Sequence, residues 1–140
     1  MDKFAMIIFG ASGDLTKRKL MPALYSLYRE KRLTGEYSIL GIGRTVYSDD
    51  NYRSYILEEL QQFVKSEEQD TALMASFVSH LYYLPMDPAK EEGYPQLRQR
   101  LVDLTGEVDP DNLLFYLATP PSLYGVVPVS YTHLRAHETP

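Results

Sequence analysis

The chain has 140 residues, 44% of them hydrophobic and 24% charged, with no Cys and a net charge of −5. This length allows one hydrophobic core, and the lack of cysteine excludes a disulfide framework, a thiolate metal site and a cysteine nucleophile. The charge argues against nucleic-acid binding, no apolar run reaches the roughly 20 residues of a membrane span, and no signal peptide is visible, so we expect a cytoplasmic domain.

The first part of the chain alternates a strand pattern with a helix pattern. An apolar run over residues 3–9 ends at Gly10 and predicts a buried strand. From Lys17, apolar residues recur at helical spacing and predict a helix that ends before Gly35. The apolar stripe of this helix consists of Leu20, Leu24, Leu27 and Tyr28.

The same unit then repeats. Residues 37–43 return to an apolar strand pattern, and Asp49 and Asp50 supply carboxylates that can cap a second helix. The apolar residues of that helix are Tyr52, Tyr55, Ile56, Leu60 and Phe63.

The remaining elements follow an acidic stretch at residues 67–70, which we expect to be exposed. Residues 72–78 predict a short helix, and residues 81–84 predict a third strand, which Pro85 interrupts. Pro95 suits the first turn of another helix, and residues 113–118 predict a fourth strand. The features of that last helix are the apolar Leu97, Leu101 and Leu104 and a stop at Gly106.

Strands that alternate with helices predict an α/β fold with a doubly wound parallel sheet of the Rossmann type, covered by helices on both faces. Such sheets bind ligands beyond the carboxyl ends of their strands. The segments at those ends begin at Gly10, Arg44, Met86 and Thr119.

The loop after the first strand has the spacing G-x-x-G-x-x-T, from Gly10 through Gly13 to Thr16. Gly10 permits a tight turn, Gly13 lets the backbone approach a pyrophosphate, and the helix start offers free N–H groups to its charge. Thr16 replaces the third glycine of the dinucleotide fingerprint with a small side chain. The alternative is a simple strand-to-helix turn, but the flanking strand and helix favour the phosphate site.

Arg44 and Thr45 follow the second strand, where an acidic residue would bind the ribose hydroxyls of NAD. A guanidinium can instead bind a 2′-phosphate and stack on adenine, and the Thr45 hydroxyl adds a donor. These residues therefore favour NADP over NAD, with a solvated surface arginine as the alternative.

Three segments read FGASGDLTKRKLMPALY at residues 9–25, GIGR at 41–44 and LFYLATPPSLY at 114–124. In this order they resemble the amino-terminal coenzyme domain of the glucose-6-phosphate dehydrogenase family. The resemblance covers residues 3–127. It implies an NADP-dependent oxidoreductase that oxidises glucose 6-phosphate at carbon 1 to the lactone, in the oxidative pentose phosphate pathway.

The resemblance also implies roles for individual residues. The loop would bind the pyrophosphate, Arg44 and Thr45 the 2′-phosphate, and Lys19 the substrate. The loop residues are Gly10, Ala11, Ser12, Gly13, Asp14, Leu15, Thr16 and Lys17. The residues expected on the adenosine and nicotinamide sides are Met86, Asp87, Ala118, Pro120 and Tyr124.

The family's catalytic histidine belongs to a His-Tyr-Leu-Gly-Lys type motif, which this sequence lacks. His80 is expected to lie at the end of a strand or at the surface. We therefore expect no catalytic residue in this chain and no turnover by it alone. The family also commonly forms homo-oligomers, largely through the domain that is absent here.

The sequence leaves two other functions to consider. A stand-alone NADP-binding regulatory module would use the same loop without catalysis. A short-chain reductase or epimerase would need a third glycine near Thr16 and a downstream Tyr-x-x-x-Lys pair, whose nearest approach is Tyr28 to Arg32 in the first helix.

Residues 128–140 depart from the preceding composition and contain two of the three histidines. His133 and His137 have the i, i+4 spacing of a helical metal site. The segment nevertheless resembles the in-frame translation of a sequencing adapter. We therefore expect a coenzyme domain at residues 1–127, a non-native tail at 128–140 and no metal site.

Overall fold

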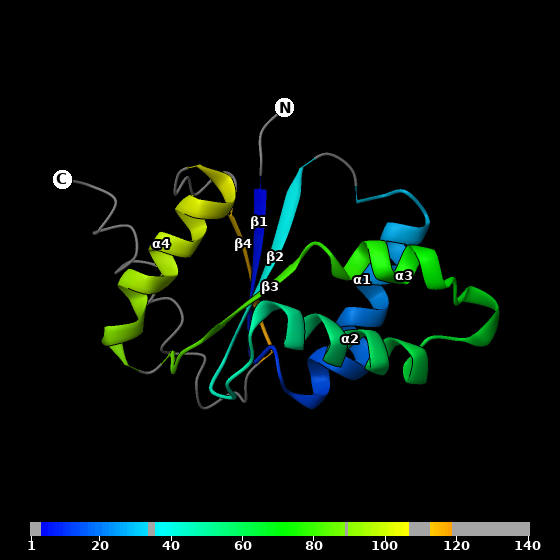
Figure 1. The fold of residues 1–140 in the computed structure, drawn as a ribbon, viewed down its shortest axis with the longest axis horizontal. Coiled ribbons are helices and arrows are strands. Elements are labelled where there is room, and N and C mark those ends of the chain that lie inside the picture. The colour runs from blue at the N-terminus through cyan, green and yellow to red at the C-terminus, as the bar shows by residue number, and fades with distance from the viewer. Residues whose placement is uncertain (1–3, 34–35, 89, 107–112, 119–140) are drawn as a thin grey trace.

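The structure, a computed structural model, describes residues 4–33, 36–88, 90–106 and 113–118. Four parallel strands form one sheet in the order β3-β2-β1-β4 (Figure 1). The strands are β1 (Phe4–Phe9), β2 (Tyr37–Gly43), β3 (Leu81–Pro85) and β4 (Leu113–Leu117). The helices are α1 (Met21–Arg29), α2 (Asp49–Phe63), α3 (Thr71–Val78) and α4 (Tyr94–Thr105), with 3₁₀ turns at Ser66–Glu68 and Glu91–Gly93. The expected doubly wound fold is confirmed.

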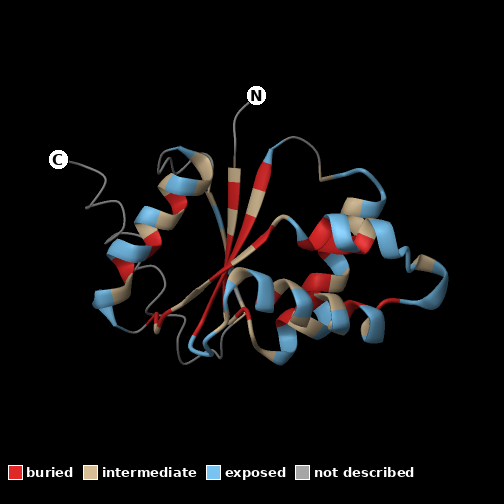
Figure 2. Cartoon of the chain, in the orientation of Figure 1, coloured by how far each residue is buried: buried red, intermediate tan, exposed pale blue. Residues whose placement is uncertain are grey.

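Helices cover both faces of the sheet, with α1, α2 and α3 on one side and α4 on the other (Figure 1). Alternation along β1 decides which residue faces which layer: Ile8 packs with the three-helix layer, whereas Ile7 and Phe9 pack with α4. Buried residues consequently line the strands and the inward sides of the helices (Figure 2). Both faces of a parallel sheet have to be covered in this way, which is why its strands read as continuous apolar runs.

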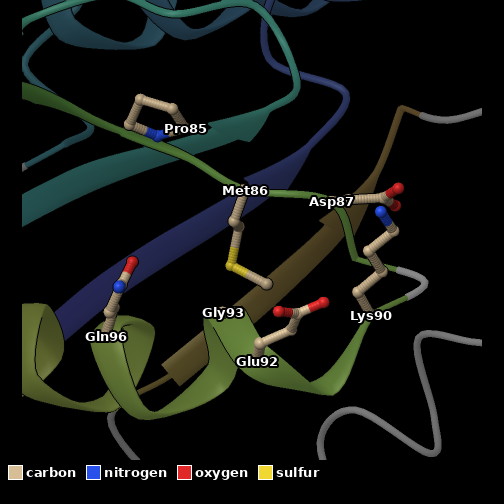
Figure 3. A pocket seen from close by; sticks show the side chains of 7 residues that line it. All are labelled: Pro85, Met86, Asp87, Lys90, Glu92, Gly93 and Gln96. Carbon is tan, nitrogen blue, oxygen red and sulfur yellow. The ribbon is translucent and has the colours of Figure 1, made fainter.

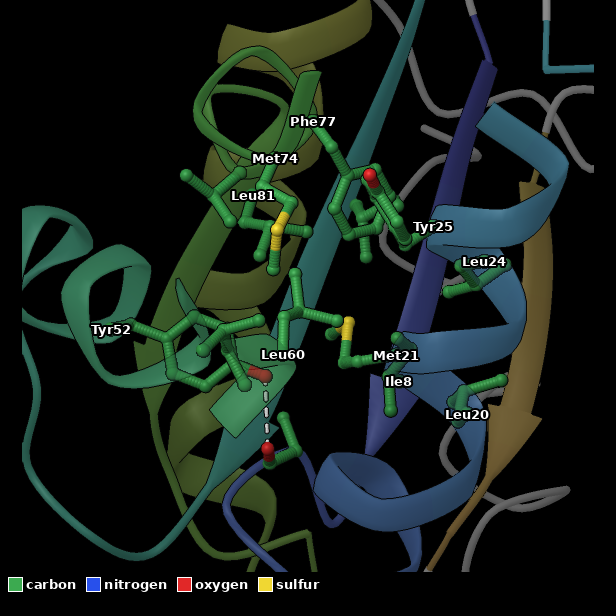
Figure 4. Packing of buried hydrophobic residues seen from close by; sticks show 14 of the residues in the cluster. Ile8, Leu20, Met21, Leu24, Tyr25, Tyr52, Leu60, Met74, Phe77 and Leu81 are labelled. Carbon is green, nitrogen blue, oxygen red and sulfur yellow. Dashed lines mark hydrogen bonds between the residues drawn. The ribbon is translucent and has the colours of Figure 1, made fainter. Parts of the chain in front are cut away.

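The larger core lies between the sheet and the three-helix layer (Figure 4). Tyr25 and Tyr52 are fully buried there and find hydrogen-bond acceptors for their hydroxyls in the backbone carbonyls of Glu68 and Ala11. A buried hydroxyl without an acceptor would cost free energy. These aromatic residues therefore fill the core and also join distant segments.

The second helix has a different cap from the one expected from the sequence. Ser48, not Asp49 or Asp50, is the N-cap, and its side chain accepts a hydrogen bond of 3.0 Å from the Asn51 amide. Asp49 lies one residue further on and accepts the Tyr83 amide of β3 at 2.8 Å. The prediction that Asp49 and Asp50 cap the helix was wrong, because the first turn directs Asp49 to the edge of the sheet.

Side chains also occupy the outer edge of β3. Besides the bond from the Tyr83 amide to Asp49, the Arg53 Nε donates to the Leu81 carbonyl at 2.8 Å. Arg100 of α4 binds both Asp49 carboxylate oxygens, at 2.9 and 3.1 Å. One amide and one carbonyl of this edge are thus engaged by α2, and Arg100 ties α2 to α4.

None of the described helices is both long enough and apolar enough to cross a membrane.

Candidate functional site

The strands that precede the four segments singled out in the sequence all end at the same edge of the sheet. Phe9 of β1 is in register with Ile42 of β2 and Leu117 of β4, and Gly43 is in register with Pro85 of β3. Hydrogen bonds continue beyond the strands. The Met86 amide donates to the Gly43 carbonyl at 2.8 Å, and the Ala118 amide donates to the Phe9 carbonyl at 2.9 Å. The described parts of the predicted site are therefore assembled at the carboxyl edge, where such sheets bind ligands.

The glycine loop turns sharply at Gly10, whose φ of 85° lies in the region that favours glycine. The Gly10 carbonyl accepts hydrogen bonds from the Gly13 amide at 3.1 Å and from the Thr16 hydroxyl at 2.9 Å. Thr16 is fully buried. Its side chain therefore does more than leave room for the strand, as the sequence suggested: it closes the turn.

The helix that follows the loop begins at Asp14 and contains one π-helical turn, Thr16–Leu20, before α1. In this turn the Met21 amide donates to the Thr16 carbonyl, five residues earlier. Pro22 has no amide hydrogen and cannot bond to the carbonyl four residues before it, so the wider turn accommodates it. Sequence reasoning missed this turn, although Pro22 was its signal.

The start of this helix presents backbone N–H groups to the carboxyl edge. Asp14 and Leu15 lie in its first turn, where amides have no acceptor within the helix. Both residues are exposed, so solvent reaches this first turn. The positive end of the helix dipole adds to the attraction for an anion.

Lys17 supplies a cation beside the loop. Its ammonium lies 3.4 Å from an Asp14 carboxylate oxygen and 3.9 Å from one of Glu59. The negative charge of Tyr55 in its ionised form contributes most to raising the pKa of the Lys17 amine, and Glu59 and Asp14 add to the effect while burial opposes it. Lys17 therefore stays charged over the whole physiological range.

Arg44 and Thr45 follow β2 next to the glycine loop. The Ser12 hydroxyl lies 3.5 Å from the Thr45 hydroxyl and joins the two segments. Arg44 is exposed and has no hydrogen-bonding or ionic partner among the described residues. Its guanidinium is thus available to a ligand that lies across the two loops.

Three tyrosines that were not predicted as site residues donate hydrogen bonds to the backbone of these loops. The hydroxyls of Tyr52 and Tyr55 donate to the Ala11 and Ser12 carbonyls, at 2.9 and 3.5 Å, and the Tyr83 hydroxyl donates to the Thr45 carbonyl at 2.6 Å. Burial raises the pKa of all three phenols. Tyr52 and Tyr55 carried a signal for helix packing alone, and Tyr83 one for a strand, so their partners were not foreseeable from spacing.

Met86 and Asp87 lie at the end of β3, over a hollow of about 230 Å³ between that strand end and the start of α4 (Figure 3). Lys90, Glu92 and Gln96 also line it. Met86 packs so closely on Gly93 that a Cβ there would lie 3.0 Å from the methionine side chain. The hollow has an apolar floor and a charged rim.

The other predicted residues fall in different places. Ala118 extends from β4 and packs partly against the larger core, whereas Pro120, Tyr124 and the predicted tail lie outside the described residues. Lys19 is exposed on the π-helical turn. His80 immediately precedes β3, at the edge of the sheet opposite the carboxyl ends of the strands. Its ring stacks there on that of Tyr37, with the ring centroids 4.3 Å apart.

The described residues contain no cluster of three or more His, Asp or Glu side chains that could bind a metal ion. What the carboxyl edge combines is an open helix start, a tight glycine turn and two cations, Lys17 and Arg44. These features suit an extended anionic ligand.

Comparisons with known proteins agree with this chemistry. A family profile described as "Glucose-6-phosphate dehydrogenase, NAD binding domain" matches residues 7–139. The chain is 44% identical over 124 residues to glucose-6-phosphate 1-dehydrogenase of Aggregatibacter actinomycetemcomitans, a match that covers 88% of this chain and 24% of that protein. It is 35% identical over 133 residues to the enzyme of Treponema pallidum, covering 94% and 25%.

Solved structures give the same result. Glucose-6-phosphate 1-dehydrogenase from Mycobacterium avium superposes with a TM-score of 0.78 at 26% identity, covering 94% of this chain and 27% of that one. A glucose-6-phosphate dehydrogenase in complex with its substrate glucose-6-phosphate superposes with a TM-score of 0.77 at 30% identity, covering 99% of this chain and 28% of that one. The chain thus spans about a quarter of the length of the relatives it matches.

Proposed function

The chain belongs to the glucose-6-phosphate dehydrogenase family, through the domain described as NAD binding, and on this premise we propose that it is the NADP-binding part of such an enzyme. The whole enzyme would oxidise glucose 6-phosphate to the 6-phosphoglucono-lactone and reduce NADP, in the oxidative pentose phosphate pathway. We further propose that it acts in the cytoplasm as a homo-oligomer.

The observation that carries the proposal is the pairing of two anion-binding features at one edge. The helix start at Asp14 and the guanidinium of Arg44 flank the contact between Ser12 and Thr45, whose hydroxyl oxygens are 3.5 Å apart. NADP carries a pyrophosphate and, at the adenosine end, a 2′-phosphate, so it requires two separate anion sites. An acidic residue in place of Arg44 would have favoured NAD.

Each residue then has a task. The loop Gly10–Lys17 binds the pyrophosphate through the first-turn amides and the Lys17 ammonium, while Arg44 and Thr45 bind the 2′-phosphate. Met86, Asp87 and Ala118 lie against the adenosine and nicotinamide parts, and we assign Pro120 and Tyr124 to the same group. The bound coenzyme supplies the hydride acceptor.

Lys19 is the residue of this chain that we assign to the substrate. It is exposed on the π-helical turn, two residues beyond Lys17. An ammonium there suits the phosphate of a sugar phosphate. We propose no catalytic base here, since His80 lies at the opposite edge of the sheet and stacks on Tyr37. The chain alone is therefore expected to give no NADPH from glucose 6-phosphate.

The test is calorimetric titration of the chain with NADP and then with NAD. Arg44→Ala should weaken NADP binding by about 10- to 100-fold, because a charged hydrogen-bonded pair contributes about 1.5–3 kcal/mol. NAD binding should change little, since NAD has no 2′-phosphate. Arg29→Ala is the matched control, because Arg29 is an exposed arginine at the far end of α1. Equal losses for the two coenzymes would refute the assignment of Arg44.

A further inference from the structure

Two glycines in β2 leave room for tyrosine side chains of the core to reach the loops of the site. Gly41 and Gly43 both lie on the sheet face that the three-helix layer covers. A Cβ at Gly41 would lie 2.6 Å from the Ala11 Cβ and 3.3 Å from the Tyr52 hydroxyl. A Cβ at Gly43 would lie 2.5 Å from the Tyr83 hydroxyl. Side chains at these positions would therefore block the two phenols.

Tyr52 passes over Gly41 to the glycine loop. It is fully buried, and its hydroxyl donates to the Ala11 carbonyl at 2.9 Å (Figure 4). Its ring also contacts that of Tyr83, with centroids 4.7 Å apart. The bond is made to the residue just after the Gly10 turn, so it fixes the loop that precedes the open helix start.

Tyr83 passes over Gly43 to the other loop. Its hydroxyl donates to the Thr45 carbonyl at 2.6 Å. Its own backbone is anchored in turn, because its amide donates to Asp49, which Arg100 binds. Tyr83 thus connects a rigid strand edge to the residue next to Arg44.

We propose that Tyr52 and Tyr83 are positioning residues with separate tasks: Tyr52 fixes the loop that binds the pyrophosphate common to both coenzymes, and Tyr83 fixes the turn that carries Arg44 and so sets the preference for NADP. This inference rests on the proposed function. The separation follows from the acceptors, since Ala11 belongs to the pyrophosphate loop and Thr45 adjoins the residue assigned to the 2′-phosphate.

Both hydroxyls act as donors, which requires that they stay protonated. Burial is the largest cause that raises the pKa of each phenol, and neighbouring tyrosines add to it, whereas a side-chain hydrogen bond with Ser12 opposes the rise in Tyr83. Ionisation therefore does not break either bond at physiological pH. A phenylalanine keeps the ring packing of either residue and removes only the hydroxyl.

The experiment compares Tyr52→Phe, Tyr83→Phe and Tyr25→Phe in the full chain by titration with NADP and NAD. Removal of the Tyr83 bond should lower the ratio of NADP to NAD affinity about 2- to 10-fold, the range expected for one hydrogen bond. Tyr52→Phe should weaken both coenzymes by a similar factor and leave the ratio unchanged. Tyr25 is the control, because its buried hydroxyl donates to the Glu68 carbonyl, far from the loops.

A merely structural role would lower stability in all three variants and leave the ratio alone. An unchanged ratio in Tyr83→Phe, or a changed ratio in Tyr52→Phe, overturns the proposal. Amide hydrogen exchange without coenzyme provides a second measurement: Tyr52→Phe should speed exchange at residues 10–15, and Tyr25→Phe should not. If the wild-type chain binds neither coenzyme, the proposed function and the specificity task of Tyr83 both fail, whereas exchange still decides the loop-positioning task of Tyr52.

Discussion

The lack of a side chain at Gly43 leaves room for the Tyr83 hydroxyl. A Cβ there would lie 2.5 Å from the Tyr83 hydroxyl but 3.4 Å from the ring carbon that bears it. Contact with the ring carbon would be ordinary, whereas contact with the oxygen would force the phenol to move. The Tyr83 hydroxyl oxygen is therefore the main obstacle to a side chain at position 43, and a phenylalanine at position 83 would remove it.

We expect Gly43→Ala to lower the free energy of unfolding by about 1–3 kcal/mol, the usual cost of overpacking. The same substitution in a Tyr83→Phe background should cost less, because the obstructing oxygen is gone. Urea denaturation of the two single variants and the double variant measures the coupling. Additive losses would show that Tyr83 is not what Gly43 accommodates. The nearby Ser12 Oγ, at 3.1 Å from the same Cβ, sets a residual cost common to both backgrounds.

The residues of the predicted site differ in how far the sequence could place them. Gly10, Thr16 and Arg44 were placed by their position after a strand, because parallel strands bring their carboxyl ends to one edge. The partners of Tyr52 and Tyr83 were not, because a hydroxyl that binds a carbonyl 41 or 38 residues away leaves no periodic signal. Spacing predicts the face on which a side chain lies and does not predict its hydrogen-bond acceptor.

Among the elements of the described chain, the strands β1 to β4 and the helices α1 to α4 were predicted from the sequence, because each has a recurring pattern of apolar residues. β2 (Tyr37–Gly43) was predicted with its observed ends. The π-helical turn and the Ser48 cap were missed for a shared reason: backbone hydrogen bonding decides both, and apolar periodicity does not report it.

The cap of α2 gives a direct prediction. Ser48→Ala removes the acceptor of the Asn51 amide, whose bond is 3.0 Å long, and should lower the free energy of unfolding by about 1 kcal/mol. Ser48→Asp should restore most of the loss, because a carboxylate also caps well and suits the helix dipole. Thermal denaturation followed by circular dichroism measures both. Little change in Ser48→Ala would contradict the capping role.

For the molecule as a whole, the raised pKa values predict sensitivity to alkali. Burial raises the pKa of Tyr37, Tyr52, Tyr55 and Tyr83 above the ordinary 10.0, and the pKa of Lys17 is raised above 10.5 by the Tyr55 charge first. Above pH 10 the unfolded chain loses these protons while the native chain keeps them. The native state then binds more protons, so the free energy of unfolding falls as pH rises.

This fall should be steep from pH 10 upward and absent between pH 7 and 9. Circular dichroism together with phenolate absorbance measures it. Tyr37→Phe should make the fall shallower by one proton, whereas the exposed variant Arg29→Ala should leave the slope unchanged. A pH-independent stability up to pH 12 would contradict the expectation.

The β4 side of the sheet presents apolar surface. Leu114 and Tyr116 lie on one face of β4 and are 53% and 37% exposed. An exposed edge with apolar side chains favours association between chains. Leu114→Lys should therefore reduce self-association in light scattering. Val46→Lys is the control, because Val46 is 81% exposed in a loop; an equal effect of both variants would exclude the edge as the cause.

Side chains of α2 protect the β3 edge of the sheet. Asp49 and Arg53 engage the Tyr83 amide and the Leu81 carbonyl, so a strand arriving at this edge would have to displace them. Among the described strands, β4 stands at the other end of the order β3-β2-β1-β4. The β3 edge is thereby protected against pairing with a further strand, whether from the same polypeptide or from another.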